Sequence, residues 1–157
     1  MNILLSVMHR WLYTPWRSFS VFPFVIIAVA CHNHAAPTSE SGPAKPLEST
    51  HWKLVWVSGI PGNLPYLEKE PFLLLQNGIM SGSSGCNNYF GSYSIDNGQI
   101  HFSSFGSTKM FCASAMDVET DLYLSYGSTD HYRISGSQLE LLGGTVPLAR
   151  FEAIKLK

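Results

Sequence analysis

The chain has 157 residues, which is enough for one domain of ordinary size. Charged residues make up only 13% of it, against the roughly 25% that is usual in soluble domains. Ten basic residues stand against eleven acidic ones, and this balance excludes the broad cationic face that nucleic-acid binding requires.

The N-terminus has the pattern of an export signal. Arg10 and Arg17 precede thirteen uncharged residues, 18–30, which end in small side chains. A membrane-spanning helix needs about twenty apolar residues, so this run is too short for a permanent span. We therefore predict a signal peptide over residues 1–30, with the start at either the first residue or Met8.

The end of this leader, Ala28-Val29-Ala30-Cys31, resembles the lipobox of bacterial lipoproteins, although Ala28 stands where leucine is usual. The resemblance implies a lipoprotein in which Cys31 becomes the first mature residue and carries palmitate-type acyl chains, which would anchor the chain in a membrane. His32 follows in place of the aspartate that retains lipoproteins in the inner membrane, so we expect the periplasmic side of the outer membrane. The alternative is an ordinary cleavage site followed by a chance cysteine.

Residues 31–50 have the composition of a flexible tether. Proline, serine, alanine and glycine dominate, and Leu47 is the one large aliphatic residue, so the segment cannot bury enough surface to offset its ordering entropy. His32 and His34 are possible metal ligands, but two ligands on a mobile segment make a weak site. We therefore expect no metal and no cofactor here.

Eight short strands are predicted in residues 51–157. Apolar and polar residues alternate, and Asn77-Gly78 and Asp96-Asn97-Gly98 are strong signals for hairpin turns. The predicted strands are 52–57, 72–75, 79–81, 89–95, 99–103, 131–134, 139–142 and 146–154.

One segment has the pattern of a helix. Ser114, with Asp117 three residues later, fits a capping box, and Gly127 supplies a C-terminal stop. The apolar residues recur at helical spacing, which predicts one buried stripe; they are Ala115, Val118, Leu122 and Tyr126. The elements together predict a β-rich α+β domain in which the helix covers an apolar face of the sheet.

The glycine-rich stretch 82–91 begins a set of motifs that resembles a known family. Four blocks occur in the order and spacing of META domains, also described as HslJ-like after the heat-inducible lipoprotein HslJ, and the resemblance covers residues 51–157. The blocks are Gly85-Cys86-Asn87, Gly91-Ser92-Tyr93, Thr108-Lys109-Met110 with Cys112, and Met116 with Glu119.

The resemblance implies a curled antiparallel sheet, a partial barrel, packed on one helix. It implies a cell-envelope protein linked to heat shock and to stress or antibiotic (novobiocin-type) tolerance, with no enzyme activity and no cofactor. A suggested likeness to secretin pilots makes lipid or peptide binding an alternative function. The family offers no catalytic set, so its matched positions are interpreted as structural: Gly85, Asn87, Gly91, Tyr93, Thr108, Met110 and Glu119.

Cysteine arithmetic predicts a disulfide. With Cys31 acylated, Cys86 and Cys112 remain as an even pair in an exported domain. Such a bond closes a loop of 27 residues, which the chain-entropy argument values at about 3.5 kcal/mol. It would fasten the glycine-rich bend to the start of the helix.

Two other classes of function compete with this interpretation. A cysteine hydrolase would use Cys86 or Cys112 as nucleophile, with His101 or His131 as base, in hydrogen-bond reach of one another. An interaction module would expose part of its aromatic residues to an unidentified protein or lipid ligand. A cavity between helix and sheet would favour a ligand carrier, and a packed interior would favour a protein-binding scaffold.

Overall fold

The structure is a computed structural model that describes residues 43–155. The predicted leader, the acylated Cys31 and residues 32–42 of the tether lie outside these residues and stay predictions. Within the described part of the chain, no helix has the length and apolar character needed to cross a bilayer.

Eight strands and one helix follow one another along the described chain. They are β1 (His51–Val57), β2 (Phe72–Gln76), β3 (Ile79–Ser83), β4 (Asn88–Asp96), β5 (Gln99–Ser107), α1 (Met116–Ser128), β6 (His131–Ser135), β7 (Gln138–Gly143) and β8 (Val146–Ile154).

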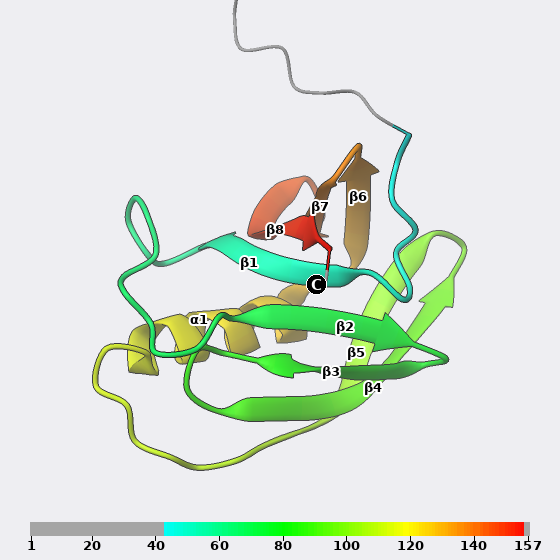
Figure 1. Ribbon diagram of the computed structural model, residues 1–157. Helices are drawn as coiled ribbons and strands as arrows, with labels where there is room; N and C mark the ends of the chain where they lie inside the picture. The colour runs from blue at the N-terminus through cyan, green and yellow to red at the C-terminus, as the bar shows by residue number, and fades with distance from the viewer. Residues whose placement is uncertain (1–42, 156–157) are drawn as a thin grey trace, which may run out of the picture. The chain divides into compact units, whose positions relative to one another are not determined.

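The strands form one curled antiparallel sheet (Figure 1). Each strand pairs with the next in sequence, and β8 pairs back with β1, so the ladder of strands closes on itself. The seam between β5 and β6 is joined by a single residue pair, Gln99 with His131. The β-rich α+β fold predicted from the sequence, a partial barrel with one helix, is confirmed.

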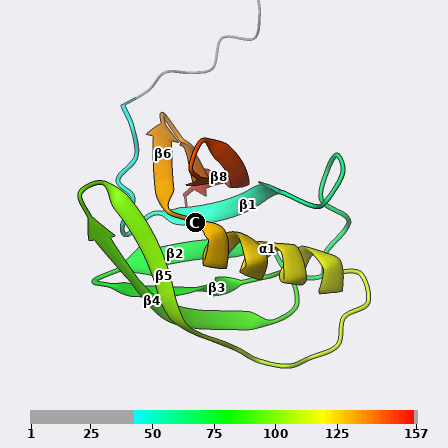
Figure 2. The ribbon, with the colours of Figure 1, turned by 180° about the vertical axis from the view of Figure 1, so that it is seen from behind.

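The helix α1 crosses the back of the sheet, below β1 and β6 in Figure 2. It packs against β5, β1, β7 and β8. Its predicted apolar stripe is buried, since Ala115, Val118, Leu122 and Tyr126 are each at most 2% exposed. The helix therefore closes the apolar interior of the curled sheet.

Both predicted ends of the helix were wrong by a residue or two. The N-cap is Ala115 and makes no side-chain hydrogen bond, so Ser114 does not form the capping box. Gly127 lies inside the helix and not in a left-handed stop, because the chain leaves the helix at Thr129, whose hydroxyl donates to the Ser125 carbonyl.

The hairpin turns follow the sequence closely. Asn77 and Gly78 have φ of 52° and 78°, and Asn97 and Gly98 have φ of 50° and 80°. Positive φ at both central residues is the geometry that asparagine-glycine pairs favour, because its twist matches that of the flanking strands.

Strand β1 departs from simple alternation. The register shifts between Leu54 and Trp56, where a bulge lies opposite β8. As a result Val57 is buried and Trp56 turns outward, where the Arg150 guanidinium lies 4.6 Å from its ring centre. A period-2 pattern cannot anticipate a one-residue bulge.

The packed unit begins before His51. Residues 45–50, assigned to the tether from their composition, run beside β6 before entering β1 (cyan in Figure 1). Leu47 is 8% exposed and its carbonyl accepts a hydrogen bond from Trp52 Nε1 at 2.9 Å. The amide of Ser49 donates to Leu75, which fixes the segment to the edge of β2.

Side chains fill the interior of the curled sheet. The largest fully buried ones come from seven of the strands, all but β6, and from the helix. They are Trp52, Tyr89, Phe151, Leu54, Leu73, Leu75, Met80, Ile100, Leu122, Leu139, Leu141 and Val57.

Candidate functional site

The predicted disulfide is confirmed. Cys86, 1% exposed, is bonded to Cys112, with 6.0 Å between their Cα atoms. The bond joins the bend between β3 and β4 to the loop that leads from β5 into α1. We name the residues around it, 83–88, 108–112 and Glu119, the disulfide corner.

Asn87 is the central polar residue of the disulfide corner and is 1% exposed. Its Oδ1 accepts from the Thr108 hydroxyl at 2.7 Å and from the Met110 amide at 2.8 Å. Its Nδ2 donates to the Met110 carbonyl at 3.0 Å and to Glu119 Oε1 at 3.1 Å. One side-chain amide therefore holds the loop before the helix and the helix itself.

Glu119 completes this network from α1. Its second carboxylate oxygen accepts a hydrogen bond from the hydroxyl of Ser84, a fully buried residue. The Ser84 amide donates in turn to the Asn87 carbonyl at 2.9 Å. The buried polar side chains of the corner thus bond to one another, which is the arrangement of an architectural network.

Two glycines of the family motif lie where a side chain would collide. Gly85 has φ of +99°, and a Cβ there would lie 2.8 Å from Leu67 Cδ1. A Cβ on Gly91 would lie 2.9 Å from the Ser103 carbonyl, at the bulge between β4 and β5. Close backbone approach therefore explains both positions.

Tyr93 lies away from the disulfide corner. It is 6% exposed, and its hydroxyl donates to the carboxylate of Glu48 in the segment before β1. Burial, followed by this bond to a carboxylate, raises the pKa of Tyr93 to about 12. Tyr93 therefore connects β4 to the chain that enters the domain, while Gly91 beside it serves strand packing.

Aromatic residues pack between α1 and strands β4 and β5. The hydroxyls of Tyr89 and Tyr126 are hydrogen-bonded to each other. The Tyr89 hydroxyl also donates to the Phe72 carbonyl at 2.7 Å. Burial raises the pKa of both phenols well above their usual range. Among the described residues, Tyr123 has the one buried side-chain oxygen without a hydrogen-bond partner.

The residues of the alternative hydrolase do not assemble. Cys86 and Cys112 are bonded to each other, so neither offers a thiolate. His101 faces solvent on β5, and the His131 ring lies 2.8 Å from Asp130 Oδ1. Within residues 43–155, no group of three or more histidine, cysteine or acidic side chains is placed to hold a metal.

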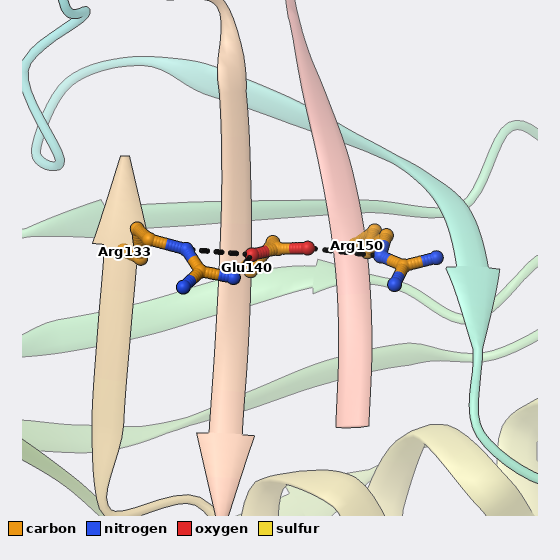
Figure 3. A network of polar contacts seen from close by, with 3 residues as sticks. All are labelled: Arg133, Glu140 and Arg150. Carbon is orange, nitrogen blue, oxygen red and sulfur yellow. Dashed lines mark hydrogen bonds and ion pairs between the residues drawn. The ribbon is translucent and has the colours of Figure 1, made fainter. Parts of the chain in front are cut away.

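A row of charges crosses the outer face of β6, β7 and β8 (Figure 3). Glu140 accepts from Arg133 Nε at 2.8 Å and from Arg150 Nε at 2.9 Å. Partial burial acts to raise the pKa of Glu140, but the two guanidinium groups hold it below its usual range. Because Arg150 also stacks on Trp56 of β1, the row links four strands. Its charged groups contact one another and the Trp56 ring.

A second polar region remains open to solvent. A cleft of about 510 Å³ lies between the segment before β1, the turn between β6 and β7, and the end of β8. We name it the tether-side cleft. Its lining residues are Lys45, Ser49, Thr50, His51, Ser137, Ala153, Ile154 and Lys155.

Two smaller clefts open elsewhere on the surface. One, of about 330 Å³, lies against the loop before β2 and is lined in part by Leu64, Tyr66 and Pro71. The other, of about 250 Å³, lies between α1 and the Ser58-Gly59 turn. The first also has two lysines, Lys53 and Lys69, but its lining includes Glu70, which pairs with Lys53. The second has serine hydroxyls and Asp121 but no lysine. The tether-side cleft differs from both because it has lysines and no carboxylate.

None of the residues that line the tether-side cleft stands out in the sequence as a site residue. Lys45, Ser49 and Thr50 stand among prolines and small residues, a composition that predicts solvated chain, and Lys155 follows the last predicted strand. One feature of the sequence does indicate that this segment packs on the domain: Leu47 is a large aliphatic residue inside an otherwise polar segment. Ser84, the partner of Glu119, was also not singled out.

Comparison with known proteins identifies the domain. Residues 45–155 match the sequence model of the META domain family. An NMR structure of a protein from Burkholderia xenovorans is similar in fold, with a TM-score of 0.56, 22% identity, and coverage of 77% of this chain and 98% of that one. A second NMR structure has a TM-score of 0.50 and 23% identity, over 66% of this chain and 88% of that one. A search of the curated proteins gave no match.

Proposed function

The chain belongs to the META domain family, and on that premise we propose that it is a non-enzymatic lipoprotein of the cell envelope. It acts by binding, in envelope maintenance or in tolerance of heat and of novobiocin-type antibiotics. Acyl chains on Cys31 hold it in a membrane, on the periplasmic side of the outer membrane, and the META domain extends from a short tether.

The disulfide is the observation that carries this proposal. A bond between Cys86 and Cys112 forms and persists in oxidising compartments such as the periplasm, and is rare in the cytosol. The same bond removes the two candidate nucleophiles of the hydrolase. The export pattern in the leader points to the same compartment by an independent route.

The packing supports binding at the outer surface. Side chains from the strands and α1 fill the interior of the curled sheet, so a ligand carried inside is not favoured. Lipid or peptide binding at the surface is the second candidate, and the tether-side cleft favours it because its lysines and hydroxyls line an open depression.

Metabolic labelling with radioactive or alkyne-bearing palmitate tests the anchor. The full chain should incorporate label and sediment with outer membranes, whereas Cys31→Ser should lose the label. Ser41→Ala, a change in the same segment, is the matched control and should keep both. Label retained in Cys31→Ser, or an unlabelled wild-type chain, would contradict the proposal.

The absence of catalysis and the role in tolerance need separate tests. A thiol-directed activity probe applied to the native exported protein should label neither Cys86 nor Cys112, and labelling of either would revive the hydrolase. A deletion strain should grow less well than its parent at elevated temperature or with novobiocin, and the full chain should restore growth where Cys31→Ser does not. Equal growth of the deletion strain under both stresses would refute the stress role.

A further inference from the structure

We propose that the tether-side cleft binds a phosphate-bearing anion, and specifically the headgroup of an acidic phospholipid. This inference deepens the proposed function, on which it rests for the choice of a membrane lipid as the source of the phosphate.

The charges of the cleft are unbalanced. Lys45 and Lys155 contribute two ammonium groups, and no carboxylate is among the lining residues. The ion pairs found within residues 43–155 involve other residues, so neither lysine is held by a carboxylate there. In a chain with an excess of acidic residues, this is a local concentration of positive charge.

Hydroxyl donors accompany the lysines. The hydroxyls of Ser49 and Ser137 make no hydrogen bond within the described part of the protein, whereas that of Thr50 donates to the Pro46 carbonyl at 2.7 Å. A phosphate presents several oxygens at once, and ammonium and hydroxyl groups are suited to them. A single carboxylate would leave part of this donor set unused.

The walls of the cleft are held in place before any ligand binds. The Lys45 amide donates to the Gly136 carbonyl at 2.9 Å, and the Ala153 amide donates to the Ser137 carbonyl at 2.8 Å. Ser49 has φ of 59°, a left-handed conformation that is costly for a residue with a side chain. Strain of this kind tends to gather at binding sites, where the surrounding structure maintains it.

Two features favour a lipid as the source of the phosphate. Ala153 and Ile154 give the cleft an apolar part, which suits the carbon atoms that adjoin a phospholipid phosphate. Thirteen residues lie between Cys31 and Lys45, and even fully extended a chain of that length spans at most about 50 Å. An anchored chain would therefore keep the cleft near headgroups at high effective concentration, where weak affinity is sufficient.

The test uses the mature chain, residues 31–157, with the disulfide formed and with Cys31→Ser so that no acyl chain interferes. Dihexanoyl phosphatidylglycerol below its micelle concentration should shift the amide signals of Ser49, Ser137 and Lys155. Dihexanoyl phosphatidylcholine should bind at least fivefold more weakly. Because this assay needs no anchor, its failure is distinct from failure of the palmitate labelling.

Variants locate the site. The double variant Lys45→Gln with Lys155→Gln should bind phosphatidylglycerol at least tenfold more weakly, because two charge-assisted contacts are lost. The matched control, Lys69→Gln with Lys109→Gln, removes the same charge elsewhere and should change affinity less than twofold. An unchanged denaturant midpoint in both double variants shows that folding is intact.

The remaining outcomes decide the source of the anion. Inorganic phosphate that binds as tightly as the lipid, at the same amides, would overturn the lipid assignment in favour of a soluble phosphate. An acidic peptide that binds more tightly than either would overturn the phosphate assignment. No shift with any phosphate probe, or equal binding by the Lys45/Lys155 double variant, would overturn the site itself.

Discussion

The disulfide corner and the tether-side cleft are both rich in polar side chains, but their hydrogen bonds go to different places. In the corner, Asn87 uses its side-chain acceptor and donors within the protein, and Glu119 accepts with both oxygens. In the cleft, the lysines and two serine hydroxyls face an open volume. Polar side chains that hydrogen-bond to one another inside the protein indicate a structural role. Polar side chains whose donors face solvent indicate a binding surface.

The two regions should therefore respond differently to substitution. Removing a partner in the buried corner leaves a polar group desolvated and unpaired, which costs about 1–3 kcal/mol. Removing an exposed lysine changes stability within about 0.5 kcal/mol but removes a ligand contact. Stability measurements and binding measurements should thus separate the regions.

Loss of the disulfide is the largest expected effect. Cys86→Ser with Cys112→Ser should lower the free energy of unfolding by about 3.5 kcal/mol, because the unfolded chain regains the entropy of a 27-residue loop. Urea unfolding of the oxidised wild type and of the double variant measures this loss. Added reductant should destabilise the wild type by the same amount and leave the variant unchanged; a reductant effect on the variant would contradict the assignment.

Asn87→Ala should be nearly as damaging. It removes four hydrogen bonds and leaves the Met110 backbone amide and carbonyl and the Oε1 atom of Glu119 without their Asn87 partner, which we expect to cost about 3 kcal/mol in urea unfolding. Asn88→Ala is the matched control, since Asn88 is the exposed neighbour and should change stability by less than about 0.5 kcal/mol. Equal effects of the two substitutions would show that the corner network contributes little.

A carboxylate at the same position sharpens this test. Asn87→Asp retains the acceptor for the Met110 amide but places a second carboxylate beside Glu119. Repulsion between the two carboxylates should raise the pKa of the introduced side chain in the folded state above its value in the unfolded chain. Protonation then favours the folded form, and the variant should regain stability as the pH falls through that raised pKa. A variant that loses stability more steeply than the wild type on acidification would contradict the proposed contact.

Tyr93→Phe tests the connection between the sheet and the segment that lines the cleft. Loss of the bond to Glu48 should cost about 1 kcal/mol at neutral pH. The folded pKa of Tyr93 is raised to about 12 from the usual 10.0, so its contribution is complete below pH 10 and is lost between pH 10 and 12. The variant should therefore lose stability less steeply in that range, with the remaining slope due to Tyr89, Tyr123 and Tyr126, whose pKa values burial also raises.

Unfolding midpoints between pH 9 and 12 measure that slope. Tyr66→Phe is the control, because the Tyr66 side chain is 87% exposed, and its curve should coincide with that of the wild type. Identical slopes for Tyr93→Phe and the wild type would remove Tyr93 from the alkaline transition.

Local sequence patterns predicted much of this fold. They failed where contacts between distant parts of the chain determine the local conformation. The asparagine-glycine turns and the buried stripe of α1 follow from backbone preference and periodicity, which act over a few residues. The bulge at Trp56 lies opposite β8, and Leu47 packs into the core cluster, so both depend on partners elsewhere in the chain. The unused capping box at Ser114 lies two residues after Cys112, which is bonded to Cys86. The cleft belongs to this second class, since its lysines are 110 residues apart in sequence.

Ser49→Gly has the smallest expected effect, and it separates folding stability from ligand affinity most directly. Glycine adopts the observed φ of 59° without steric cost, so the substitution should raise stability by about 0.5 kcal/mol after the entropy of the unfolded chain is included. Ser94→Gly, at an exposed strand position without positive φ, should lower stability by about 0.5–1 kcal/mol. Because Ser49→Gly also removes a hydroxyl from the cleft, phosphatidylglycerol should bind more weakly to a more stable protein. A gain in stability with unchanged affinity would mean that the strain at Ser49 serves only the turn, and a loss in both would place Ser49 with the architectural residues of the disulfide corner.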